Sequence, residues 1–208
     1  MHYDRLSALD RSFLDLEGAN THMHVAGCFL FEKGPLTTPS GGVDIDKVRD
    51  YVASRLHRIP RYRQRIAYIP VENHPVWVDD DRFNIHYHVR HAALPAPGDE
   101  RQLKRLCGRI MSQQLDRGKP LWEMWVVEGI EHDRFALICK THHCMVDGVS
   151  GVDLLAVLLS PAPDKEFEPA ARWMPNPTPS GGALLRDAVL RRFELPIAMA
   201  GAVGAAVR

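Results

Sequence analysis

Apolar residues recur at regular spacing along most of the first 160 positions of the chain. In three segments they lie three or four positions apart, which predicts helices over residues 7–17, 43–59 and 100–115, and a fourth helix is predicted over residues 148–160. Ser7 is a suitable N-cap for the first helix, and Asp44 lies near the start of the second. The residues expected to face the core are Leu9, Phe13 and Leu16, then Ile45, Val48, Val52 and Leu56, then Leu103, Leu106, Cys107 and Ile110.

Six segments between or beside these helices are predicted to be strands: residues 21–32, 63–71, 74–80, 83–94, 121–130 and 134–143. In residues 83–94, the apolar side chains of Phe83, Ile85, Tyr87 and Val89 alternate with polar ones. His86 and His88 are therefore expected to share the opposite, solvent-facing side of a strand. The mixture of helices and strands predicts one α/β domain over residues 1–160.

Residues 161–182 differ in composition from the rest of the chain. They contain six of the 15 prolines and end on a pair of glycines, which is typical of a linker. Residues 183–208 are too few for a further domain, and we expect them to begin a helical segment that connects to one.

The composition narrows the class of protein further. The formal net charge is +0, so no basic excess is available to neutralise a phosphate backbone, and nucleic-acid binding is not expected. None of the four cysteines forms a Cys-x-x-Cys pair, and no stretch has the apolar core of a signal peptide or the length of a membrane span. We therefore expect a cytoplasmic protein with reduced thiols.

The segment LICKTHHCMVDGVSG, residues 137–151, places two adjacent histidines at the end of a predicted strand. Because side chains alternate along a strand, His142 and His143 should point in opposite directions, and only one can easily enter a given channel. Asp147 is placed to fix the loop, and Gly148 lets the backbone turn and leaves room for a substrate. Three interpretations are open: a polar strand end with Asp147 capping the next helix, a metal site, and a catalytic loop.

The metal interpretation is the least favoured, because alternation separates the two histidines and no third ligand is evident. We expect no bound metal. A catalytic loop needs a base that titrates near the working pH, and histidine is the natural residue for that role. No serine or cysteine nucleophile accompanies the pair, and Cys144 is expected to be buried and inert. This pattern favours direct transfer between two bound substrates, without a covalent enzyme intermediate.

Residues 142–148 match the HHxxxDG motif of the acyl-CoA-dependent acyltransferase superfamily, which the condensation domains of peptide synthetases share. The segment LDRGKPLWEMWVVEG adds a Pro-Leu-Trp motif at Pro120, Leu121 and Trp122. The segments LSALDRSFLDLE, THMHVAG and WVDDDRFNIHYHVRHAALPAPGDERQL extend the likeness. Together they resemble the bacterial wax ester synthase/diacylglycerol acyltransferases, especially the triacylglycerol synthases of mycobacteria and related actinobacteria, over about residues 1–160.

This resemblance implies a fold and a set of roles. The fold would be that of the CoA-dependent acyltransferases, similar to chloramphenicol acetyltransferase: an α/β two-layer sandwich of a mixed sheet packed with helices, forming one half of a two-domain architecture. His143 would be the general base, His142 would support it, and Asp147 would be structural, held by an arginine. Candidates for that arginine are Arg61, Arg63 and Arg65, which could also meet CoA phosphates or simply form structural ion pairs. Gly148, Pro120, Leu121 and Trp122 would be channel or motif residues, although a strand start and a core tryptophan explain the last three without a substrate.

The resemblance also implies the substrates. A long-chain acyl group would move from acyl-CoA to the hydroxyl of diacylglycerol or of a fatty alcohol, giving triacylglycerol or a wax ester, with no cofactor. Such substrates imply work at the surface of a membrane or a lipid inclusion.

One departure from the family concerns length. Family members are expected to run to about twice this length, with a second, similar domain that carries an Asn-Asp motif and encloses the acyl-CoA channel. We do not find that motif here, so the C-terminal half is an expected partner. The alternative is a catalytically silent, half-length module that binds lipid or a protein partner.

Overall fold

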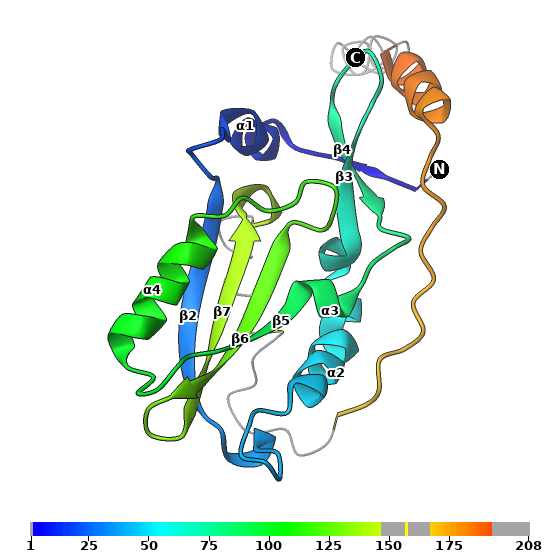
Figure 1. The fold of residues 1–208 in the computed structure, drawn as a ribbon. Helices are drawn as coiled ribbons and strands as arrows, with labels where there is room; N and C mark the ends of the chain where they lie inside the picture. The colour runs from blue at the N-terminus through cyan, green and yellow to red at the C-terminus, as the bar shows by residue number, and fades with distance from the viewer. Residues whose placement is uncertain (1, 147–156, 158–166, 193–208) are drawn as a thin grey trace, which may run out of the picture.

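The computed structural model describes residues 2–146, 157 and 167–192. At its centre is a four-stranded sheet with the order β2-β7-β6-β5 (Figure 1). Its strands are β2 (His24–Glu32), β7 (Arg134–His142), β6 (Trp122–Ile130) and β5 (Val89–Ala93). β2 and β6 both run antiparallel to β7, whereas β5 runs parallel to β6. The predicted α/β class with a mixed sheet is confirmed.

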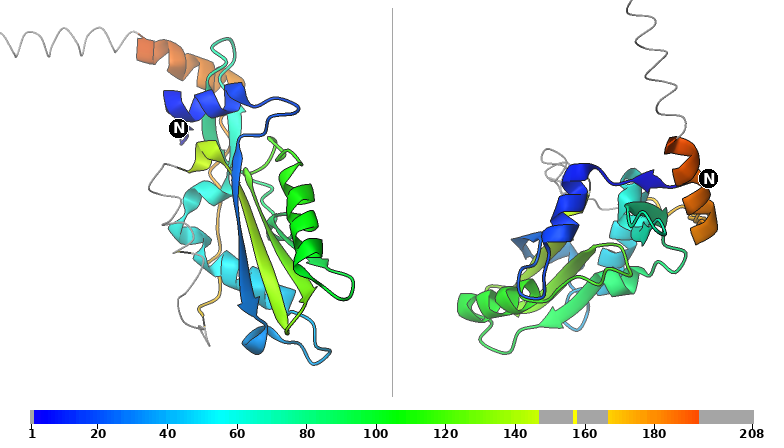
Figure 2. Two further views of the ribbon diagram at one scale, coloured as in Figure 1. Left: turned by 90° about the vertical axis from the view of Figure 1, so that its left-hand side faces the viewer. Right: turned by 90° about the horizontal axis from the view of Figure 1, so that it is seen from above.

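Helices cover both faces of this sheet, which Figure 2 shows edge-on. α4 (Glu100–Met111) packs Leu103 and Ile110 against one face, onto Val127, Ala136 and Ile138. α2 (Ile45–Arg55) packs Val48 and Val52 against the other face, in a larger core with Trp122, Met124, Val126 and Leu137. Because successive strand residues face opposite ways, β6 and β7 supply both cores.

Side-chain caps fix the starts of these helices. The Asp44 carboxylate accepts a hydrogen bond from the Lys47 amide at the start of α2. Asp99 and Gln102 form a reciprocal capping box at the start of α4. Short 3₁₀ turns, η1 (Gly34–Leu36), η2 (Leu56–Arg58) and η3 (Pro60–Arg63), join the elements around α2, so the predicted helix over residues 43–59 ends in η2.

A smaller antiparallel sheet has the order β1-β4-β3, with β1 (Asp4–Arg5), β4 (Pro75–Asp79) and β3 (Gln64–Tyr68). A helix over residues 181–192 packs Leu184 and Ala188 onto its outer side, against Ile69, Val76 and Val78. In Figure 1 this helix lies beside the β3–β4 hairpin. No helix within the described ranges has the length and apolarity needed to cross a bilayer.

α1 (Ala8–Leu16) begins at the predicted N-cap, where the Ser7 hydroxyl accepts a hydrogen bond from the Asp10 amide. The predicted inward face is wrong for Leu9 and Leu16, whereas Phe13 is partly buried and packs against the core as expected. Leu14 is the buried residue, at 3% exposure, whereas Leu9 and Leu16 are 66% and 64% exposed. Helical spacing identified a true apolar face, but the core side of the helix is centred on Phe13 and Leu14 and leaves Leu9 and Leu16 exposed.

Residues 83–94 do not form one strand. The Asn84 side chain accepts a hydrogen bond from the His86 amide and starts a short helix, α3 (Ile85–His88), and β5 follows it. The prediction that His88 faces solvent is wrong: it is 1% exposed and stacks between the rings of Phe83 and Trp122. Its Nδ1 donates to the Trp122 carbonyl at 2.8 Å. Burial lowers the pKa of His88 to about 4, so the ring is neutral at physiological pH.

Residues 167–180 have no regular secondary structure but are held against the domain. Asn176 donates two hydrogen bonds to Asp79 Oδ2, one from its amide at 2.9 Å and one from its side chain at 2.8 Å. Arg63 lies over the Trp173 ring, at 4.8 Å from its centroid. Whether residues 161–182 link to a further domain stays a prediction, as does the connecting role of residues 183–208. Residues 161–166 and 193–208, and all of the predicted helix over 148–160 except residue 157, lie outside the described residues.

Candidate active site

The two histidines of the HHxxxDG motif lie where β7 ends. His142 is the last residue of β7, pairs with His24 of β2, and donates its amide to the Leu121 carbonyl at 2.9 Å. His143 opens a 3₁₀ turn, η4 (His143–Met145), and its amide donates to the Met23 carbonyl at 2.8 Å. The two rings have different neighbours, in agreement with the predicted alternation.

His142 is fully buried and serves the local backbone. Its Nδ1 accepts a hydrogen bond from the Cys144 amide at 3.1 Å, which closes the η4 turn. The neutral ring therefore carries its proton on Nε2, which faces Glu17 Oε2 at 3.7 Å. Burial lowers the pKa of His142 to about 4. A ring that is neutral, enclosed and already engaged at Nδ1 is suited to positioning its neighbours.

Glu17 is a buried carboxylate directly behind His142. Its side chain is 1% exposed, and its Oε2 accepts hydrogen bonds from Arg117 Nη2 at 2.8 Å and from Gln114 Nε2 at 3.0 Å. Burial alone would raise the pKa of Glu17, but these hydrogen bonds and the nearby charges hold it below its ordinary value. The carboxylate is therefore ionised next to His142 at neutral pH.

The loop after α4 brings Arg117 to this carboxylate. Lys140 is fully buried on β7, and its Nζ donates to the carbonyls of Ile110 and Gln113, at the end of α4. His24 Nε2 donates to the Met111 carbonyl at 2.8 Å. Cationic and N–H donors are favourable at a helix C-terminus, where carbonyls lack partners. These contacts fix the start of the loop between α4 and β6, which carries Arg117.

His143 is less enclosed than His142 and lies against α1. Its ring stacks on the Phe13 ring, with centroids 4.1 Å apart and an interplanar angle of 21°. Its Nδ1 is shielded from solvent and has no hydrogen-bond partner among the described residues. This ring, unlike that of His142, does not accept a hydrogen bond from the backbone of the turn.

Cys144, next to the pair, does not provide a nucleophile. It is 4% exposed, and burial raises the pKa of its thiol to about 12, so it stays protonated. The thiol lies 3.0 Å from His142 Nδ1. Its burial agrees with the expectation of an inert cysteine and disfavours an acyl-enzyme on this residue.

The Pro-Leu-Trp segment packs in the core beside the histidines. Leu121 and Trp122 are 0% and 2% exposed, and Trp122 Nε1 donates to the Tyr62 carbonyl at 2.8 Å. The Pro120 carbonyl accepts from the Trp122 amide at 2.9 Å. The Leu121 carbonyl therefore binds the end of β7 at His142, and the Trp122 ring packs in the core.

Asp147 and Gly148 lie outside the described residues, so the arginine partner of Asp147 stays a prediction. The three candidate arginines all have other contacts. Arg61 lies over the Trp77 ring and binds Gln64, Arg63 lies over Trp173, and Arg65 Nε is 3.9 Å from Asp80. No group of three or more His, Cys, Asp or Glu within the described ranges is arranged to hold a metal ion.

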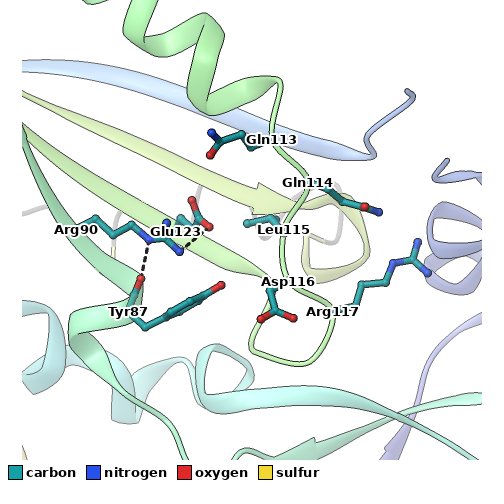
Figure 3. A pocket seen from close by; sticks show the side chains of 8 residues that line it. All are labelled: Tyr87, Arg90, Gln113, Gln114, Leu115, Asp116, Arg117 and Glu123. Carbon is teal, nitrogen blue, oxygen red and sulfur yellow. Dashed lines mark hydrogen bonds and ion pairs between the residues drawn. The ribbon is translucent and has the colours of Figure 1, made fainter. Parts of the chain in front are cut away.

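A polar pocket of about 520 Å³ lies on the α4 side, beside the loop after that helix. Figure 3 shows Arg90 bridging the Tyr87 carbonyl and the Glu123 carboxylate on one side of it, with residues 113–117 opposite. Arg117, at its rim, turns toward Glu17. Within the pocket Arg90 pairs with Glu123, and the lining does not include His143.

Two residues that frame the site, Glu17 and Arg117, were missed by the sequence reasoning. They are 100 positions apart, and neither belongs to a motif singled out above. The quoted segments LSALDRSFLDLE and LDRGKPLWEMWVVEG do contain them, at a helix end and a strand start. Only the fold brings the two together.

Comparison with known proteins gives the family. The model of the wax ester synthase/diacylglycerol acyltransferase catalytic domain matches residues 6–208. A protein of Mycobacterium tuberculosis named a probable diacylglycerol O-acyltransferase, tgs3, is 39% identical over 204 residues, which cover 98% of this chain and 73% of that protein. Another from the same organism, tgs1, is 39% identical over 157 residues, covering 74% of this chain and 33% of that protein.

Solved structures agree. The wax ester synthase/diacylglycerol acyltransferase from Marinobacter aquaeolei VT8 is 33% identical, with a TM-score of 0.67, over 79% of this chain and 40% of that chain. A condensation domain of the calcium-dependent antibiotic synthetase shares the fold, at 17% identity and a TM-score of 0.57, over 76% of this chain and 36% of that chain. This chain thus spans well under half of most of these proteins, but nearly three quarters of tgs3, so the expectation that relatives are twice as long does not hold for all. The chain belongs to the wax ester synthase/diacylglycerol acyltransferase family.

Proposed function

We propose that the protein containing this chain transfers a long-chain acyl group from acyl-CoA to the hydroxyl of diacylglycerol or of a fatty alcohol. The observation that carries the proposal is the match of the family's catalytic-domain model to residues 6–208. The relatives named as diacylglycerol O-acyltransferases favour diacylglycerol as the acceptor and hence triacylglycerol synthesis.

In this proposal His143 is the general base. It takes the proton from the acceptor hydroxyl while the oxygen attacks the thioester carbonyl carbon. The C–S bond then breaks, and the proton passes to the departing sulfur, so the products are the ester and free CoA. Support for this choice comes from His142, which is fully buried, has its Nδ1 engaged by the Cys144 amide and carries its proton on Nε2, so it offers no unengaged basic nitrogen. A placed base contributes about 100- to 10,000-fold to the rate.

The other site residues have positioning roles in the proposal. His142 closes the η4 turn that contains His143. The Leu121 carbonyl accepts the hydrogen bond of the His142 amide and so fixes its position. Asp147 orients the loop, with Gly148 beside it. The remaining wall of the channel comes from a C-terminal half of the protein, and the lipid substrates are taken up at a membrane or lipid-inclusion surface.

The test is an assay of CoA thiol release from hexadecanoyl-CoA, run with the complete natural protein that contains residues 1–208. Release should depend on added dihexadecanoylglycerol or hexadecanol, and the acylated acceptor should appear in equal amount. His143→Ala should lower the rate about 100- to 10,000-fold. His86→Ala, at an exposed histidine of α3, is the matched control and should change nothing.

Three results would contradict the proposal or part of it. Unchanged release in His143→Ala would remove the base assignment. Release without any ester product, sensitive to a chelator, would indicate a metal-dependent hydrolase. Lipid binding without any release of CoA would indicate the catalytically silent module instead.

A further inference from the structure

An apolar stripe on α1 lies open beside the candidate base. It consists of the exposed Leu9 and Leu16 and the partly buried Phe13, which the helical repeat places on one face; Phe13 also packs against the core cluster that contains Leu14. Leu9 and Leu16 are 66% and 64% exposed. Large apolar side chains at helical spacing are normally buried, so two exposed leucines on either side of the partly buried Phe13 indicate a binding surface.

The stripe is continuous with the candidate active site. Phe13, at its middle, stacks on the His143 ring at a centroid distance of 4.1 Å. Val25 on β2 adds to the apolar surface nearby: it is 41% exposed and pairs with Thr141, two residues before His143. A molecule with its polar end at His143 can therefore lay a hydrocarbon chain on Phe13 and onward along α1.

The size of the stripe indicates a single chain as its occupant. Charged residues border it, with Arg11 and Asp15 paired at 3.2 Å on the same helix. A stable protein interface needs about 800 Å² from each partner, which three side chains with charged borders do not provide. One alkyl chain needs only a narrow apolar track along a helix about 13 Å long.

We propose that Leu9, Phe13 and Leu16 form the binding track for the alkyl chain of the acyl acceptor. This inference rests on the proposed function and names the subsite of one of its substrates. The acceptor is favoured over acyl-CoA because its hydroxyl must hydrogen-bond to the base, at about 2.6–3.2 Å, before transfer. The carbons next to that hydroxyl are then the substrate atoms closest to His143 and to the Phe13 ring stacked on it.

The experiment compares Leu9→Ser, Leu16→Ser and the double variant with Met174→Ser, at an apolar residue that is also well exposed, at 77%, and far along the chain from α1. CoA release by the complete protein is measured with hexadecanol and with butanol as acceptors. Each α1 substitution should raise KM for hexadecanol by about 3- to 10-fold, given about 25 cal/mol per Å² of lost apolar contact. KM for butanol and for hexadecanoyl-CoA should stay within about twofold of the parent value, and Met174→Ser should match the parent throughout.

A second measurement separates this inference from the proposed function. Binding of a pyrene-labelled long-chain alcohol, followed by fluorescence without turnover, should weaken in the double variant even if the protein releases no CoA. Equal binding of the probe in parent and double variant would overturn the inference. A raised KM for hexadecanoyl-CoA alone would also overturn it, because the stripe would then bind the acyl chain of acyl-CoA and not the acceptor. A lowered melting temperature with unchanged probe binding would also overturn it, since the stripe would then serve packing.

Discussion

Glu17 Oε2 lies 3.7 Å from His142 Nε2, and the same oxygen accepts a hydrogen bond from Arg117. Through this contact, an ion pair between a buried carboxylate and a half-buried guanidinium, from two distant parts of the chain, lies next to the turn that carries His143. His142 transmits the constraint, because its other nitrogen accepts from the Cys144 amide within that turn. The turn that carries His143 therefore contacts the ion pair of Glu17 and Arg117 through the His142 ring.

Glu17→Gln should destabilise the protein and slow the reaction. Glutamine keeps the shape of the side chain but removes the charge that pairs with Arg117. Allowing for the 34% exposure of Arg117, we expect the free energy of unfolding to fall by about 1–3 kcal/mol, measured by urea denaturation. Glu100→Gln, in an exposed pair with Lys104, is the control and should have no measurable effect. Equal stability of Glu17→Gln and the parent would show that the pair does not support the turn.

Stability should fall as the pH drops from about 6.5 toward 4. His88 and His142 have pKa values lowered to about 4 by burial, whereas in the unfolded chain they titrate near 6.5. In that window the unfolded chain binds more protons than the folded one, so acid favours unfolding, by up to about 3 kcal/mol for each ring. Above pH 7 neither ring contributes any slope. Denaturant titrations at half-unit pH steps measure this, and a profile flat from pH 7 to 4.5 would contradict it.

Replacing a titrating ring tests the same point. His142→Phe should remove part of the acid slope while lowering stability at pH 7, because the Cys144 amide loses its acceptor. His86→Gln should leave the slope intact, since His86 is exposed.

Trp122→Phe should separate a core role of the Pro-Leu-Trp segment from a role in substrate binding. The substitution leaves the Tyr62 carbonyl without its donor, and we expect the free energy of unfolding to fall by about 1–3 kcal/mol. At temperatures where the variant is folded, KM for both substrates should match the parent. Trp173→Phe, at a partly buried ring on residues 167–180, is the control. A raised KM in a fully folded Trp122→Phe variant would place the ring in the channel.

Asp79→Ala should release residues 167–180 from the domain. Asp79 Oδ2 accepts both hydrogen bonds from Asn176, so its removal leaves this segment without its main polar anchor. Limited proteolysis should then cut the segment several times faster, read by mass spectrometry. Asp81→Ala, at an exposed neighbour, should be cut at the parent rate. Unchanged cutting in Asp79→Ala would show that other contacts hold the segment.

Much of the fold was predictable because the local signals agree with the tertiary structure. The strands over residues 121–130 and 134–143 and the helix over residues 100–115 were found within a few residues of their ends. The Ser7 cap was found because a side-chain cap depends only on its own turn. The prediction of one strand over residues 83–94 failed because Asn84 caps a short helix there. His88 is buried because its ring stacks with those of Phe83 and Trp122.

The candidate site was predictable in part. Alternation along β7 correctly separated the rings of His142 and His143, which needs only the period of a strand, whereas the choice of His143 came from the family resemblance. The partners of these rings were not predictable, because Glu17, Arg117 and Phe13 reach them through the fold and not through any spacing. The prediction for Leu9 and Leu16 of α1 failed for a related reason: helical spacing marks an apolar face but not how much of that face the rest of the protein covers.

The contact between Tyr3 and Asp187 ties the first residues of the chain to the helix over residues 181–192. β1 pairs with β4, and the helix packs Leu184 and Ala188 on the same hairpin, so both elements contact the β3–β4 hairpin. Segments that share their support open together in native-state hydrogen exchange. The two ends of the described chain should therefore behave as one cooperative unit, with matched amide protection. Trimming the N-terminus before Leu6 would loosen a helix 180 positions away.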